Sequence, residues 1–249
     1  MTRLPSKLKH DIILEALFEL RFEPGPPNEA VFGVIYPVIM EKFQDLNPMA
    51  LPFLQLPDVV RNSDAQFKYQ PLNRLHRDGL SINIGPRVIS FSILKPYIGW
   101  SRWKPDILEI LNILSVKNVI KCVERTGLRY INFIEGDVFP LIKAEFNIID
   151  STIKPISTTV RTEIMESEYV KILQLANCAS VNGNGPTKNG SVIDIDIARN
   201  KKIQNHDFRI NLETILDRSH SMAKQLFFDI LNDEFLNTLE PVYGEDSNG

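Results

Sequence analysis

Hydrophobic residues fall in short runs broken by proline, glycine and polar residues. Runs that alternate or cluster apolar side chains predict strands over residues 15–22, 67–72, 80–84, 88–94, 158–165, 169–178 and 191–198. Segments with apolar residues three and four apart predict helices over residues 31–44, 103–123 and 219–239. Strands that end in a long helix thus occur twice along the chain, and residues 182–190 form a glycine-rich loop in the second half.

A short pattern also repeats, with an arginine between two apolar residues. It stands at Leu20-Arg21-Phe22 and again at Leu128-Arg129-Tyr130. We therefore predict an α+β fold with an internal duplication. Two similar lobes, residues 1–125 and 126–249, would each pack an antiparallel curved sheet on a long C-terminal helix. A single integrated domain is the alternative.

Three sequence stretches carry a resemblance to a known family. They are residues 15–22, Tyr97-Ile98-Gly99-Trp100, and Gly127-Leu128-Arg129-Tyr130-Ile131-Asn132. Together they resemble a sporadically distributed prokaryotic family of uncharacterised proteins of about this length. Residues 74–77 depart from the aromatic and basic run usual in that family. The resemblance supplies no catalytic residue, and the family's patchy distribution implies a link to prokaryotic defence or mobile elements.

The motif arginines, Arg21 and Arg129, have two interpretations. They could converge on one anion, because a guanidinium presents several donors in a fixed fork. Alternatively, each could pair with a nearby glutamate, Glu19, Glu23 or Glu135, and bridge the lobes, or it could simply face solvent. We expect the pairing, because a partly buried arginine needs an acidic partner.

Candidate catalytic and metal-binding groups are few. Asp194 and Asp196 share one face of the predicted strand, about 7 Å apart, and could bind a divalent metal or act as paired carboxylates. We expect instead that they lie on the solvated face of that strand. No two histidines have metal-ligand spacing, and no phosphate-binding loop occurs. Ser219, which precedes His220, is predicted to cap a helix rather than to act as a nucleophile. We predict no metal and no cofactor, and we find no catalytic constellation that would indicate an enzyme.

Charge is distributed unevenly along the chain. Residues 68–104 contain seven basic residues and one acidic residue, together with several aromatic rings, whereas residues 226–249 contain six acidic residues and no lysine or arginine. Basic side chains among rings suit single-stranded nucleic acid or an anionic small ligand. The candidate binding residues are Arg74, Arg77, Arg87, Tyr97, Trp100 and Arg102. Alternatively, the rings form core and the charges a rim, or the segment binds the acidic end of another copy or a partner protein.

Composition restricts the function only loosely. The net charge of −3 argues against a general polyanion binder. The first ten residues lack the apolar core of a secretory signal, and no apolar run approaches the roughly 18 residues that span a bilayer, so we expect a cytoplasmic protein. The sequence favours a non-enzymatic binding or adaptor protein with a protein partner or a second copy, and a nucleic-acid or anion binder is the alternative.

Overall fold

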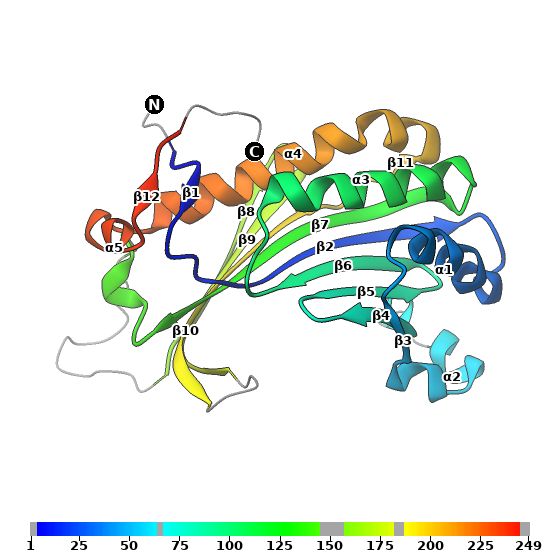
Figure 1. Ribbon diagram of the computed structural model, residues 1–249, viewed down its shortest axis with the longest axis horizontal. Helices are drawn as coiled ribbons and strands as arrows, with labels where there is room; N and C mark the ends of the chain where they lie inside the picture. Colours follow the sequence, from blue (N-terminus) through cyan, green and yellow to red (C-terminus); the bar gives the residue numbers. More distant parts are fainter. Residues whose placement is uncertain (1–3, 64–66, 145–156, 182–186, 245–249) are drawn as a thin grey trace.

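The computed structural model describes residues 4–63, 67–144, 157–181 and 187–244 (Figure 1). Its main feature is a ten-stranded sheet in which every strand pair is antiparallel. The strands of this sheet are β2 (Ile13–Pro24), β3 (Asn47–Ala50), β4 (Asn73–Arg77), β5 (Leu80–Gly85), β6 (Val88–Leu94), β7 (Ile120–Glu135), β8 (Thr159–Glu166), β9 (Tyr169–Val181), β10 (Lys188–Arg199) and β11 (Ile203–Gln204). The short strands β1 (Lys7–Leu8) and β12 (Pro241–Val242) pair with each other in a separate sheet.

The strand order places β2 and β7 side by side at the centre. The order is β3-β4-β5-β6-β2-β7-β10-β9-β8, and β11 pairs with the start of β7. Both copies of the repeated pattern lie on this central pair, where Phe18 is opposite Leu128. The predicted α+β class with an antiparallel sheet and a long C-terminal helix is confirmed. The two halves share one sheet, and the expected boundary at residues 125 and 126 falls inside β7.

Three helices cover one face of the sheet: α1 (Val31–Lys42), α3 (Trp100–Val116) and α4 (Asn205–Ile230). Figure 1 shows α3 and α4 side by side along β7, with the end of α3 beside the start of α4. Two shorter helices are α2 (Asp58–Ser63) and α5 (Asp233–Thr238). No helix in the described part of the chain is long and apolar enough to cross a membrane.

The core lies between the helices and the sheet. Alternate residues of β2 point into it, so that Ala16, Phe18, Leu20 and Phe22 are all fully buried. Helix α3 contributes Trp103, Ile107, Ile110, Leu111 and Leu114, and α4 contributes Phe208, Leu212 and Leu216. The apolar spacing that predicted the helix over residues 103–123 is the spacing with which α3 fills this core, whereas Phe208, Leu212 and Leu216 lie before the helix predicted over residues 219–239.

All three predicted helices have different bounds in the structure, and the one predicted over residues 31–44 ends at Lys42. The helix predicted over residues 103–123 begins at Trp100 and ends at Val116, because Asn118 has a φ of 53° that reverses the chain, and Ile120 then begins β7. The helix predicted over residues 219–239 begins at Asn205 and ends at Ile230. The expected cap, Ser219, lies inside α4, where its Oγ donates to the Ile215 carbonyl at 2.9 Å.

The predicted strand at residues 67–72 is wrong. Pairing instead begins at Asn73, which lies opposite Ile84. Pro71 has no N–H to donate to a ladder, so the strand starts only after it. The strand predicted at residues 88–94 agrees with β6 at both ends.

Candidate functional site

The face of the central strands turned away from α3 and α4 is charged. We name it the polar face and define it by Glu15, Glu19, Arg21, Arg125, Arg129, Asp194 and Asp196. These residues alternate along β2, β7 and β10 with side chains that enter the core. The strand pairing brings them together although they are far apart in sequence.

Arg125 connects the acids of two neighbouring strands. Its Nη1 lies 2.8 Å from Oε1 of Glu19, and its Nη2 lies 2.7 Å from Oδ2 of Asp196. Arg21 donates from Nε to the same Glu19 oxygen at 2.7 Å. The guanidinium of Arg125 lies across Gly127, where an added Cβ would come within 2.4 Å of Nη1. A glycine at this position thus makes room for the ion pairs.

Arg129 forms a separate pair with Asp194. Its Nε lies 2.8 Å from Oδ1, and its Nη2 donates to the other carboxylate oxygen. These hydrogen bonds raise the pKa of Arg129 further above its ordinary value. Asp194 is only 8% exposed, so the prediction that it lies on a solvated face is wrong. Its burial is tolerated because the guanidinium compensates the carboxylate.

The motif arginines therefore pair with acids and do not converge on one position. Arg21 uses the neighbouring Glu19, as expected, whereas Arg129 uses Asp194 from another strand. Asp196 is held by Arg125, and burial raises the pKa of its carboxyl despite that cation. No group of three or more His, Cys, Asp or Glu side chains suited to a metal ion occurs within the described residues.

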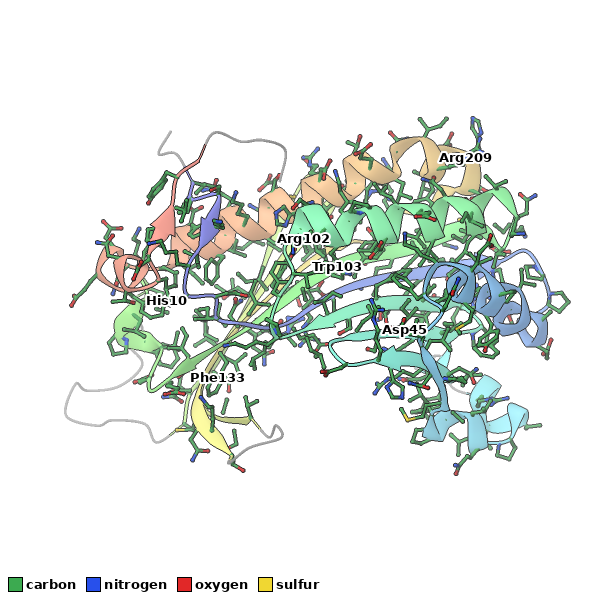
Figure 2. The ribbon with its side chains drawn as sticks, in the orientation of Figure 1. His10, Asp45, Arg102, Trp103, Phe133 and Arg209 are labelled. Atoms are coloured by element: carbon green, nitrogen blue, oxygen red, sulfur yellow. The ribbon has the colours of Figure 1, made fainter. Side chains whose placement is uncertain are left out.

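The basic residues of segment 68–104 do not form one surface. Arg77 pairs with Asp45 at 2.7 Å, and Arg87 lies 3.4 Å from Glu124 at the far end of the neighbouring strands. Arg74 donates to the Asn83 side chain at 2.7 Å. Carboxylates from other parts of the chain thus neutralise much of the charge that is concentrated in the sequence. Arg102 is exposed at the start of α3, one position from the buried Trp103 (Figure 2).

The candidate rings Tyr97 and Trp100 belong to a packed aromatic cluster. Trp100 is 4% exposed, and its ring stacks on the imidazole of His220 with centroids 4.7 Å apart. Trp103 packs edge-on against both Trp100 and Tyr97. The ring faces of the two tryptophans are therefore occupied within the protein and are not available to stack on bases.

A hydrogen-bond chain runs through this cluster. The Tyr130 hydroxyl lies 3.0 Å from Nδ1 of His220 and 3.3 Å from the Tyr97 hydroxyl. Burial lowers the pKa of His220 to about 4, and burial raises the pKa values of both tyrosines. All three groups are therefore neutral near pH 7. His220 faces the rings and Ser219 bonds to its own helix, so these adjacent residues do not form a nucleophile–base pair.

A further feature lies at the edge strand β3. Five apolar side chains within twelve residues are exposed to solvent, and we name them the apolar edge: Met49, Leu54, Leu56, Val59 and Val60. They lie on β3, on the short 3-10 helix Pro52–Gln55 and the residue that follows it, and on α2, which are grouped at one edge of the sheet (Figure 1). Sequence reasoning missed this group, because residues 45–66 have no apolar period. The sequence feature that could have revealed this group is the presence of apolar residues in a stretch where three prolines prevent a long helix or strand.

Comparison of the sequence with models of known protein families and with curated protein sequences finds no match.

Proposed function

We propose that the protein is a non-enzymatic binding protein that binds a partner protein through the apolar edge. The observation that carries this proposal is the exposure of the five side chains, from 36% for Leu56 to 82% for Val59. Contiguous exposed apolar surface is unfavourable in water and is typical of protein interaction sites. Covering this group with an apolar partner surface would remove that cost.

The apolar edge differs from the polar face in its chemistry, because its exposed side chains are apolar. The arginines of the polar face are already paired with Glu19, Asp194 and Asp196 within the sheet. Strand β3 is four residues long and includes Pro48, which limits the addition of another strand at this edge. Side-chain burial at the short 3-10 helix and α2 is therefore the contact that we propose, and β-sheet extension is not.

Nucleic-acid binding through residues 68–104 is the weaker alternative. Such binding needs unpaired cations for phosphate and free ring faces for stacking. Arg77, Arg87 and Lys104 pair with carboxylates, and Trp100 stacks on His220. A role in prokaryotic defence or in mobile elements, which the family resemblance implies, stays a prediction.

We also infer that the chain arose by duplication. The order β4-β5-β6-β2 in the first half corresponds to β8-β9-β10-β7 in the second, and each set is followed by a long helix. The two units meet at the central pair of β2 and β7. Superposition of residues 13–116 on residues 120–230 tests this inference. Helices α3 and α4 falling on different faces of the superposed sheets would contradict it.

Co-purification from the native host tests the proposed interface. A Leu54→Asp/Val59→Asp variant should lose a partner that the unchanged protein retains, because a carboxylate in an apolar contact is costly to desolvate. Met165→Asp is a matched control, since Met165 is 72% exposed on β8 at the opposite edge of the sheet. The partner would be identified by mass spectrometry, and its affinity for each variant measured with purified components.

Three outcomes have distinct meanings. Loss of the partner in the double variant alone supports the proposed interface, provided that circular dichroism shows both variants to be folded. Equal binding by all forms contradicts it. If light scattering instead shows self-association that only the double variant abolishes, the partner at this edge is a second copy.

A further inference from the structure

The two edges of the ten-stranded sheet differ in how readily they can accept another strand. One edge is β3, which has four residues and includes Pro48. The other edge is β8, which has eight residues, no proline and no lysine, and pairs with β9 without a bulge. Among the described residues, no strand pairs with the outer edge of β8. A strand of this length at an open edge presents a row of backbone N–H and C=O groups to another chain.

The register of β8 with β9 shows which residues of β8 face outward. The Asn177 N–H donates to the Thr158 carbonyl at 3.1 Å, so the backbone of Thr158 is directed toward β9. In an antiparallel sheet, successive residues of a strand direct their N–H and C=O groups alternately to its two sides. The odd-numbered residues from Thr159 to Met165 therefore direct these groups away from β9. They are the residues that can bond to another strand.

The side chains of β8 form two sets on opposite sides of the sheet. Arg161 and Glu163 lie on the side of the polar face, as the strand pairing shows. They pair with each other and are 46% and 56% exposed, so this pair contributes little to stability and either residue can take another partner. Val160 and Ile164 lie on the helix side, where Val160 packs against the core and Ile164 is 44% exposed.

One antiparallel register between two copies of β8 matches these side chains. Outward-facing residues must lie opposite each other, so near the middle of the strand Arg161 can lie opposite itself, Glu163 opposite itself, or Arg161 opposite Glu163. The first two registers place like charges together, which is destabilising. The third places Arg161 of each copy opposite Glu163 of the other, and Val160 opposite Ile164. The twofold axis then passes beside Thr162.

We propose that a second copy of the chain pairs with β8 in this third register, so that the two ten-stranded sheets become one continuous sheet. Both copies contribute the same strand, so the interface is closed and self-complementary. Val160 of each copy covers the exposed Ile164 of the other. Strand pairing at one edge buries little surface, so the dimer should form at micromolar concentration. This interface is separate from the apolar edge, and either proposal can fail without the other.

Sedimentation velocity of the full chain over a range of concentrations tests the dimer. Arg161→Glu should weaken it about tenfold or more, because like charges then face each other at two symmetric positions. The double exchange Arg161→Glu/Glu163→Arg should restore the dimer, because opposite charges again lie across the interface. A mixture of the two single variants, Arg161→Glu and Glu163→Arg, should form a heterodimer more tightly than either variant forms a homodimer. The Leu54→Asp/Val59→Asp variant should dimerise like the unchanged protein, which separates this interface from the apolar edge.

Cysteine cross-linking tests the register. In a Cys178→Ser background, which removes the exposed native thiol, Thr162→Cys should give a disulfide-linked dimer on oxidation. Residues opposite each other in a non-hydrogen-bonded pair have Cα atoms about 4.5 Å apart, within disulfide range. Thr159→Cys is the matched control, because Thr159 is also exposed on β8 but lies opposite Met165 in this register, about 20 Å from its own counterpart.

Three results would overturn the proposal. They are a protein that stays monomeric at millimolar concentration, an Arg161→Glu variant that dimerises as tightly as the unchanged protein, and equal cross-linking through Thr162→Cys and Thr159→Cys. Loss of folding is detected separately, because substitutions at these exposed positions should leave the melting temperature of the diluted monomer unchanged. Should Arg161→Glu alone misfold, recovery of the dimer in the double exchange and the cross-linking pair still decide the proposal.

Discussion

Strand β7 serves two regions with opposite chemistry. On the helix side it contributes Tyr130, whose hydroxyl joins neutral His220 and Tyr97 among buried rings. On the polar face it contributes Arg125 and Arg129, whose guanidinium groups pair with carboxylates from β2 and β10. Polar groups are therefore accommodated in two ways along one strand. Burial keeps the imidazole and the hydroxyls neutral, whereas the carboxylates on the other face are compensated by arginines.

The aromatic cluster and the polar face stabilise the fold, whereas the surface suited to binding lies in other parts of the molecule. The aromatic cluster and the ion pairs of the polar face find their partners within the protein, although Oγ1 of Thr126 on the same strand is buried without one. Exposed apolar surface that a partner could cover lies elsewhere, at the apolar edge. We infer that the centre of the sheet holds the fold while its periphery carries recognition.

The largest expected effect comes from the helix side. Leu111 is fully buried in the core, so Leu111→Ala should lower the free energy of unfolding by about 2–5 kcal/mol. Urea denaturation measures this change. Val116→Ala on the same helix is the control, because Val116 is 61% exposed and the change should stay within about 0.5 kcal/mol. Similar losses in both variants would mean that the burial of α3 is misplaced.

A smaller effect is expected from the polar face. Arg125→Ala removes the cation shared by Glu19 and Asp196 and should lower the free energy of unfolding by about 1–3 kcal/mol, a value reduced from that of a fully buried pair because these groups are partly exposed. Arg161→Ala should change it by less than about 0.5 kcal/mol, since the Arg161–Glu163 pair is exposed. Denaturation at low and high salt compares the two. An Arg125 variant as stable as the unchanged protein would remove the distinction between the faces.

The smallest effect is a pH dependence from His220. Its pKa of about 4 in the folded state lies below its ordinary 6.5, so folding favours the neutral imidazole. This contribution is complete above pH 6.5 and is lost as the pH falls toward 4. Between pH 7.5 and pH 5, the unchanged protein should lose about 1–2 kcal/mol more stability than His220→Gln. Equal losses in urea titrations at the two pH values would argue against a neutral, buried imidazole.

Local patterns predicted elements well where packing agreed with them. The apolar pattern at residues 88–94 predicted β6, because Ile89, Phe91 and Ile93 are buried in the core. The helix expected to continue to residue 123 stopped at Val116, since Asn118 turns the chain and Ile120 and Val123 then pack as strand residues. Both residues have apolar side chains that suit either element. Only the pairing with β2 decided between them.

The ion pairs of the candidate site could not be predicted from any single segment, because their partners are far apart in the sequence. Lys104 meets Asp217, and Arg129 meets Asp194, across more than sixty positions. Residues 68–104 do carry an excess of positive charge, but carboxylates from other segments of the chain pair with most of these cations in the folded protein. The alternation of Asp194 and Asp196 was correctly assigned to one face, while their burial against arginines required the neighbouring strands.

The central pairing of β2 with β7 has a consequence for synthesis of the protein on the ribosome. Strand β2 emerges early and can pair with β6 once residue 94 has been made, but its other edge meets β7 only after residue 135. Over that interval a twelve-residue strand with four core side chains has an open edge. Nascent chains stalled between these two lengths should therefore be the ones most dependent on chaperones.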